Sequence, residues 1–266
     1  MNDTLENLIL GFVEGITEFL PISSTGHLLI AQHWLGARSE LFTVTIQVGA
    51  ILGVLVIYWR RLLDLVLRFG VPENRDYFLK LAGSFLITVA GGFAAKQLGF
   101  QLPESIAPVA WVLLVGGVLI LVIERLLASA APNEALTWRV AIWVAIGQIV
   151  AAVFPGTSRS AAAIFAAMLA GQTSRPAATE FAFLVGIPTM FAAAGYEFLK
   201  LLTHGGAGLA GEDWGGLAIA FVASAVVAFA SVKWLLVYIR SHRFTIFAWY
   251  RIALGAALLI FLNAQR

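Results

Sequence analysis

The sequence predicts an all-α integral membrane protein of six transmembrane helices and two re-entrant helix hairpins, arranged as an inverted-topology repeat. Three observations lead to this fold class. The 266 residues are 60% hydrophobic and 12% charged, whereas soluble domains carry about 25% charged residues. Six apolar segments approach the roughly 20 residues that a helix needs to cross a bilayer. Two further apolar regions are broken by polar, proline-containing segments that lie half a chain apart.

The first apolar region, residues 8–35, is predicted to be a re-entrant hairpin, because the polar run Pro21–His27 interrupts it. Irregular polar backbone at membrane depth is tolerated only where protein buries it or a water-filled cavity adjoins it. Three predicted spans follow this hairpin: Leu41–Trp59, Leu81–Ala95 and Ala107–Ile123.

The second half of the chain repeats this order. Residues 140–172 form a second predicted hairpin, which is broken by the polar run Pro155–Ser160. Its three spans are Phe181–Tyr196, Trp214–Val232 and Phe244–Asn263. Charged residues that border or interrupt the six spans must snorkel or face the protein interior: Lys80, Lys96, Glu197, Lys200 and Arg251.

Spacing within the hairpins indicates an internal repeat in a single membrane domain, with copies at 1–133 and 134–266. Pro21 and Pro155 lie 134 residues apart. Matching polar residues flank the two prolines at equal spacing: Glu14 and Gln148 seven residues before, Ser24 and Ser158 three residues after. Each hairpin precedes an odd number of spans, so the second copy starts from the opposite side of the membrane.

The distribution of basic residues predicts the orientation, because cytoplasmic loops are rich in Lys and Arg. Basic residues gather at Arg60–Lys80, Arg125–Arg139 and Arg240–Arg243, whereas residues 1–37 and the acidic segment 204–213 have none. We therefore expect both termini outside, the first hairpin entering from outside and the second from inside. The first basic residue is Arg38, so we expect no cleavable signal peptide.

Composition excludes several other classes of function. With 17 basic and 15 acidic residues the net charge is only +2, so we expect no nucleic-acid partner. The absence of cysteine excludes disulfides, thiol chemistry and cysteine-ligated metals.

Glu14 and Glu18 are the first candidate site residues, because a spacing of four places both carboxylates on one helix face. Two carboxylates in an apolar hairpin are costly unless a divalent cation, an arginine or protonation offsets them. The alternative is a first helix that lies at the membrane interface, with both acids in water.

The hydroxyls of Ser23, Ser24 and Thr25 precede His27 at the start of a predicted helix, where the positive helix end favours an oxyanion. Alternatively, these residues form an ordinary helix cap and proline turn, and His27 is a satisfied buried histidine. The functional interpretation rests on the clustering of these groups. Carboxylates, hydroxyls and an imidazole all lie within one apolar 14-residue stretch from Glu14 to His27.

Arg159 is the only charged residue between Arg139 and Arg175, and it lies at the second hairpin tip. Its planar guanidinium suits phosphate or carboxylate, so it either binds an oxyanion or pairs with one of the two hairpin glutamates. Residues of both tips are predicted to bind a phosphate-containing substrate: Ser23, Thr25, Gly156, Thr157, Ser158, Arg159 and Ser160. This inventory suits the splitting of a phosphate ester or anhydride.

The runs Glu14–His27 and Pro155–Ser160 resemble the undecaprenyl-pyrophosphate phosphatase family, the BacA-type bacitracin-resistance proteins. The similarity extends along the chain to further segments: Ile46–Gly49, Tyr58–Arg61, Glu180–Phe181, Pro188 and Tyr250–Arg251. It implies an enzyme of the bacterial inner membrane that removes the terminal phosphate of a C55 isoprenyl diphosphate, with a site reached from the periplasm. It thereby implies a polyprenyl diphosphate lipid as substrate and a role in recycling the peptidoglycan lipid carrier.

The resemblance also implies roles for individual residues. Glu14 and Glu18 would bind a divalent cation, Mg²⁺ or Ca²⁺, and Arg159 would clamp the diphosphate. The catalytic set would be Glu18, Ser24, His27 and Arg159. Ser24 with His27 as base is the first hypothesis for the nucleophile; attack by His27 itself, or by water with a glutamate as base, stays open.

One segment departs from the family pattern. After Ser160 the family usually has Gly-Ala-Thr, whereas this chain has Ala161–Ala163, which removes one hydroxyl that could contact phosphate or metal. A rival phosphatase class with the signature Ser-Arg-x5-His-x3-Asp fits poorly, because Phe165 stands where its histidine is needed.

Two alternatives concern function and assembly. A lipid flippase or transporter would use the same inverted repeat, and phosphate release without a bilayer would distinguish an enzyme from it. A homodimer is a further hypothesis, since glycine pairs at Gly91–Gly92 and Gly116–Gly117 could pack against a second copy or within the bundle.

Overall fold

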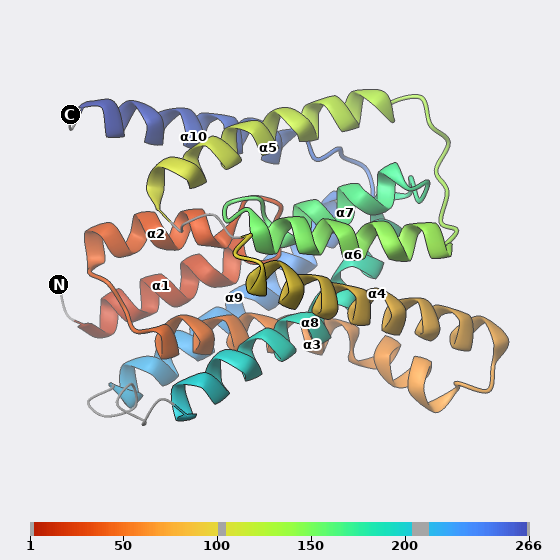
Figure 1. The fold of residues 1–266 in the computed structure, drawn as a ribbon, viewed down its shortest axis with the longest axis horizontal. Helices are drawn as coiled ribbons and strands as arrows, with labels where there is room; N and C mark the ends of the chain where they lie inside the picture. The colour runs from red at the N-terminus through yellow and green to blue at the C-terminus, as the bar shows by residue number, and fades with distance from the viewer. Residues whose placement is uncertain (1–2, 101–104, 204–212, 265–266) are drawn as a thin grey trace.

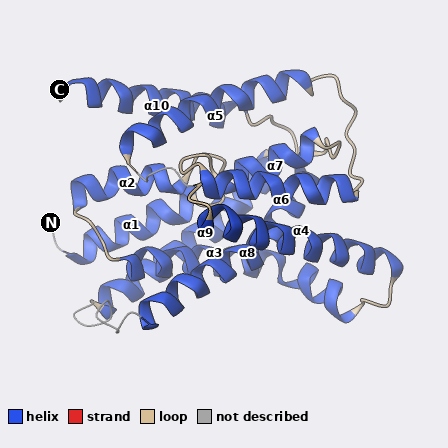
Figure 2. Ribbon diagram, in the orientation of Figure 1, coloured by secondary structure: helices blue, strands red, loops and turns tan. Residues whose placement is uncertain are grey.

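The computed structural model describes residues 3–100, 105–203 and 213–264, which fold entirely as helices and loops (Figure 2). The all-α prediction is therefore confirmed. Ten helices follow in chain order (Figure 1): α1 (Asp3–Thr17), α2 (Ser24–Leu35), α3 (Glu40–Leu67), α4 (Pro72–Gln97), α5 (Ile106–Leu126), α6 (Trp138–Val153), α7 (Arg159–Leu169), α8 (Arg175–Thr203), α9 (Trp214–Tyr238) and α10 (Thr245–Ala264). Most of the acidic segment used to predict orientation, residues 204–212, lies outside the described residues.

Six of these helices, α3, α4, α5, α8, α9 and α10, are long and apolar enough to cross a membrane, which confirms the predicted number of spans. Several run beyond the expected uncharged segments. Helix α3 continues to Leu67, past Arg60 and Arg61. The Arg61 guanidinium lies over the Tyr77 ring at 4.7 Å and pairs with Glu180 at 3.4 Å. Charged side chains with such partners extend a helix beyond its hydrophobic segment without breaking it.

The two broken apolar regions each form a pair of short helices that pack on each other, α1 with α2 and α6 with α7. Helix α1 begins by Asp3 rather than at residue 8, because Asp3 and Glu6 in its first turn suit the positive helix end. Residues 18–23 connect α1 to α2 and are called the first loop. Residues 154–158 connect α6 to α7 and are called the second loop.

Each loop ends in a serine that caps the next helix. Ser23 accepts a hydrogen bond from the Gly26 amide at 3.4 Å, and Ser158 accepts one from the Ala161 amide at 3.3 Å. Both serines have left-handed backbones, with φ of 75° and 70°. The capping roles therefore match Ser23 with Ser158. Counting from the prolines instead matched Ser24 with Ser158, because the second loop has one residue more between proline and cap.

Glycines bring α9 close to two other helices. Gly11 and Gly15 of α1 face the α9 backbone on one side, and Gly49 and Gly53 of α3 face it on the other. At each position a Cβ would lie within 2.6 Å of an α9 carbonyl oxygen. The Ser224 hydroxyl of α9 also donates to the Ile46 carbonyl at 2.7 Å. Close packing of this kind holds apolar helices together where burial from water contributes little.

The glycine pairs considered for a second copy mostly pack within this chain. Gly117 of α5 faces Ala248 and Ile252 of α10, with which α5 runs as a pair along the upper edge of Figure 1. Gly91 faces Ile149, whereas nothing lies within 4 Å of a Cβ placed on Gly92.

Charged residues of the spans behave as predicted, either facing the interior or pairing near the surface. Lys80 is buried and donates to the Leu136 carbonyl at 2.7 Å. Lys96 pairs with Glu197 at 3.2 Å. Arg251 is completely buried, and its surroundings define the candidate site.

Candidate active site

The first and second loops meet in the protein interior. Ser160, in the first turn of α7, donates to the Leu20 carbonyl of the first loop at 3.1 Å. The Ser158 hydroxyl lies 3.5 Å from the same carbonyl and 2.9 Å from the Ser160 hydroxyl. Residues about 140 positions apart in the chain are thus in direct contact.

Arg251 of α10 joins the two loops. Its Nη1 donates to the Thr157 carbonyl at 2.8 Å and to the Pro21 carbonyl at 3.4 Å, and its Nη2 donates to the Gly156 carbonyl at 3.1 Å. Two α5 carbonyls complete the shell, Val112 at 3.4 Å and Leu113 at 3.5 Å. No described carboxylate forms an ion pair with this guanidinium, so backbone dipoles alone stabilise its buried charge.

Two glycines make room for this arrangement. A Cβ on Gly116 would lie 2.2 Å from Arg251 Nη2, so only glycine leaves space for the guanidinium beside α5. Gly156 has a φ of +95°, and a Cβ there would lie 3.1 Å from the Val109 carbonyl oxygen. The second loop can therefore lie directly against α5 because Gly156 lacks a side chain, while Gly116 leaves room for Arg251.

The acidic pair lies in the protein interior. Glu14 is fully buried and Glu18 is 7% exposed, which excludes the interpretation that both acids sit in water. Neither carboxylate oxygen of Glu14 has a hydrogen-bond donor, and the charges acting on it come from Glu18 and Arg159. Arg159 forms no ion pair with either glutamate, so the predicted alternative of a structural Arg–Glu pair is not formed.

Gln148 adds a second unsatisfied group that the sequence-based site did not include. Its amide is 2% exposed, and neither its oxygen nor its nitrogen has a partner. With Glu18, Arg159 and Ser160 it lines one small cavity between the two hairpins. Buried polar atoms are nearly always paired, so unpaired ones around a cavity indicate a ligand site. Its position seven residues before Pro155, matching Glu14, was the signal that could have identified it.

Ser24 is bonded to Glu18 rather than to His27. The Ser24 hydroxyl donates a short hydrogen bond to Glu18 Oε2. The His27 ring has two other partners: Nδ1 lies 2.7 Å from the Ser23 carbonyl and Nε2 lies 2.6 Å from the Tyr250 hydroxyl. Because a carbonyl can only accept, neutral His27 carries its proton on Nδ1 and accepts from Tyr250.

The remaining predicted residues lie around these contacts. Gly156 and Thr157 direct their carbonyls at Arg251, and the Thr157 hydroxyl donates to the Phe154 carbonyl at 2.6 Å. Thr25 is half-buried in the first turn of α2. Ala163, where the family usually has threonine, lines the cavity with Glu18, so a hydroxyl there would enter the site.

A larger cavity of about 300 Å³ opens beside the small one and shares Gln148 and Arg159 with it. Helices α4, α6 and α8 form its walls, which are largely apolar. Val89, Phe93 and Ile149 are among the residues that line it. Arg159 therefore lines both cavities, the small one that also contains Glu18 and the larger apolar one.

Residues 7–257, nearly the whole chain, match the family described as bacitracin resistance protein BacA. The chain belongs to this family. An undecaprenyl-diphosphatase of Rhizobium etli (strain CIAT 652) is 63% identical over 257 residues, covering 97% of this chain and 96% of the relative. An undecaprenyl-diphosphatase of Xanthomonas oryzae pv. oryzae (strain PXO99A) is 53% identical over 264 residues, or 99% of each chain. The match thus includes both short-helix pairs from residue 7 onward and the six long helices up to residue 257, within α10.

We expect Gly116→Ala to destabilise the protein, because the added methyl group would occupy the place of Arg251 Nη2. Overpacking and the displaced hydrogen bonds should cost about 1–3 kcal/mol. Thermal unfolding of the purified protein in detergent measures this as a lowered melting temperature. Gly92→Ala is the matched control, since it adds a methyl group to a helix where nothing lies within 4 Å. Equal melting temperatures for the two variants would contradict the proposed packing.

Proposed function

We propose that this protein is an undecaprenyl-diphosphatase of the bacterial inner membrane, which hydrolyses the C55 isoprenyl diphosphate to the monophosphate and inorganic phosphate. The observation that carries the proposal is that both short-helix pairs line one small cavity, with Glu18 from the first pair and Gln148, Arg159 and Ser160 from the second. Relatives more than half identical over nearly the full length bear the same enzyme name.

The apolar cavity beside the site suits the isoprenyl chain of this substrate. Its lipid part would lie between α4, α6 and α8, while its diphosphate reaches Arg159 at the cavity's inner end. Helices α2 and α7 both begin at the site, at Ser24 and Arg159, so two positive helix ends favour the anionic headgroup.

In the proposed reaction the Ser24 oxygen attacks the terminal phosphorus, and its proton passes to Glu18, to which it is already hydrogen-bonded. The bond from phosphorus to the bridging oxygen breaks, and undecaprenyl monophosphate leaves. Water then attacks the phosphoserine, which releases inorganic phosphate and restores Ser24. Arg159 neutralises charge on the transferred group throughout. In this scheme His27 holds the first loop through Ser23 rather than acting as the base.

A divalent cation, Mg²⁺ or Ca²⁺, fits the acidic pair. Both Glu14 oxygens are buried without donors, as expected for atoms that a cation would satisfy. The described residues contain no cluster of three or more acidic or histidine ligands, and Mg²⁺ is commonly held by one or two carboxylates plus substrate phosphates. Glu14 and Glu18 would hold the ion, which supplies positive charge next to the diphosphate when bound.

We further propose that the two short-helix pairs are re-entrant hairpins of an inverted-topology repeat, with copies at 1–133 and 134–266. The helices α1, α2, α6 and α7 have 15, 12, 16 and 11 residues, fewer than the roughly 20 that cross a bilayer. The start of α1 and the end of α10 lie at one end of the bundle in Figure 1, which agrees with the expectation that both termini lie on the same side of the membrane. We propose that this side is the periplasm and that the site is reached from it.

Purified protein in detergent should release phosphate from undecaprenyl diphosphate. Such release needs no bilayer, so it distinguishes the diphosphatase from a flippase. Arg159→Ala should lower kcat/KM by about 100-fold or more, because the main positive contact to the transferred phosphate is lost. Ser24→Ala and Glu18→Gln should cause losses of similar size. Arg139→Ala, at an exposed arginine on α6, serves as the control. Unchanged turnover in Arg159→Ala would refute the site.

Removal of divalent cations should abolish phosphate release, and added Mg²⁺ or Ca²⁺ should restore it. Glu14→Gln should weaken the response to the added cation, because one ligand loses its charge. Glu73→Gln, at an exposed carboxylate on α4, should respond as the wild type does. Full activity in the presence of a chelator would show that the acidic pair needs no metal.

A further inference from the structure

Besides Arg159, the cavity between α4, α6 and α8 is lined by a second positively charged residue, Lys96. Among the described residues that line it, only three are charged: Arg159, Lys96 and Glu197. Arg159 lies where the larger cavity adjoins the small one, whereas Lys96 lies near the end of α4. A headgroup that reaches Arg159 through this cavity therefore passes a lysine.

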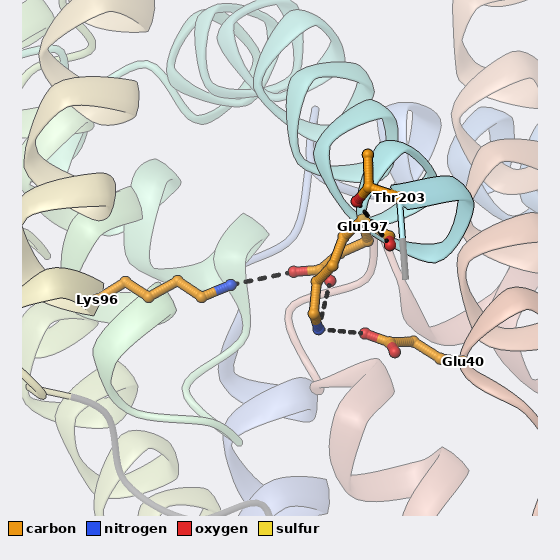
Figure 3. A network of polar contacts seen from close by, with 5 residues as sticks. Glu40, Lys96, Glu197 and Thr203 are labelled. Atoms are coloured by element: carbon orange, nitrogen blue, oxygen red, sulfur yellow. Dashed lines mark hydrogen bonds and ion pairs between the residues drawn. The ribbon is translucent and has the colours of Figure 1, made fainter. Parts of the chain in front are cut away.

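The ion pair between Lys96 and Glu197 costs little free energy to break. Figure 3 shows Lys96 extending from α4 to Glu197 on α8, with Nζ 3.2 Å from Oε1. The Lys96 side chain is 48% exposed, and exposed ion pairs contribute little to stability. Its Nζ also lies 4.7 Å from the centroid of the Tyr196 ring, which lines the same cavity.

Glu197 also has a second cation. Lys200 lies 3.3 Å from Glu197 Oε2 and 3.4 Å from Glu40 of α3. If Lys96 moves away, the Glu197 carboxylate keeps Lys200 as its partner. These ion pairs therefore keep Lys96 beside the cavity, but Glu197 does not need Lys96 to balance its charge.

The charge of the diphosphate gives a second basic residue a role. A diphosphate monoester carries at least two negative charges, and the divalent cation proposed above is balanced by the buried Glu14 and Glu18 carboxylates that would hold it. Arg159 supplies one positive charge on a rigid fork. A lysine is a compact charge with three donors on a flexible stem, so it can follow a moving phosphate group.

We propose that Lys96 is a substrate-binding residue that exchanges the Glu197 carboxylate for a phosphate oxygen when the lipid diphosphate enters the cavity. This inference rests on the proposed diphosphatase function. It assigns Lys96 to capture of the headgroup on entry, before the diphosphate reaches Arg159 and the isoprenyl chain follows into the cavity, and it leaves the reacting atoms to Ser24, Glu18 and Arg159. The effect of its loss is therefore expected in KM rather than in kcat.

Steady-state phosphate release by the full-length protein in detergent tests this assignment. Lys96→Gln should raise KM for undecaprenyl diphosphate by about five- to twentyfold and change kcat by less than about twofold. Lys96→Arg should keep KM within about twofold of the wild type. Glu197→Gln should leave KM unchanged or lower it, because Lys96 is then released. Lys233→Gln is the control, since Lys233 is exposed on α9 and packs over the Phe229 ring at 4.9 Å.

A binding measurement separates this inference from the proposed reaction. Inorganic pyrophosphate should raise the melting temperature of the wild type and of Lys233→Gln, and this rise should shrink in Lys96→Gln. Equal shifts and equal KM values in Lys96→Gln and wild type would overturn the role of Lys96 while leaving the diphosphatase intact. A wild type that binds pyrophosphate but releases no phosphate from the lipid would instead refute the proposed function.

Discussion

The buried guanidinium of Arg251 is the contact on which the site depends. It reaches from α10 to carbonyl groups of both loops and of α5, which belong to distant parts of the chain. Because carbonyl oxygens and no carboxylate surround the guanidinium, it keeps its positive charge while its position is fixed. Gly116 provides the space that it occupies. Loops have few constraints of their own, so the Arg251 side chain, together with the contacts of Ser158 and Ser160 to the Leu20 carbonyl, holds their relative position in the apolar interior.

Several polar groups of the two short-helix pairs are held at a cost in stability. Glu14 and Gln148 are buried without hydrogen-bond partners, and each unpaired group costs about 1–3 kcal/mol. Ser23 and Ser158 add strain, because both have left-handed backbones that side-chain-bearing residues rarely adopt. Strain and unpaired groups thus lie at equivalent places in both short-helix pairs, which supports the ligand site proposed above.

Much of the fold could be predicted, because apolar segments of bilayer length are long signals and the few charges that interrupt them are conspicuous. Glu14, Glu18 and Arg159 were identifiable for the same reason. The interaction partners of these residues could not be identified from the sequence. Spacing gives the face of a helix but not the path of a loop, so the bond from Ser24 to Glu18 and the contact of His27 with Tyr250 depend on tertiary packing. The five carbonyl contacts of Arg251 likewise join segments that no local pattern relates.

The central claim, that both hairpin tips bind one diphosphate, is tested most directly by an experimental structure with bound ligand. The ligand would be an undecaprenyl diphosphate analogue whose bridging oxygen is replaced by a methylene group, so that it cannot be cleaved there. The diphosphate should lie between Ser24 and Glu18 of the first hairpin and Arg159 of the second, with the isoprenyl chain between α4, α6 and α8. A diphosphate bound away from Arg159, or by one hairpin alone, would contradict the claim.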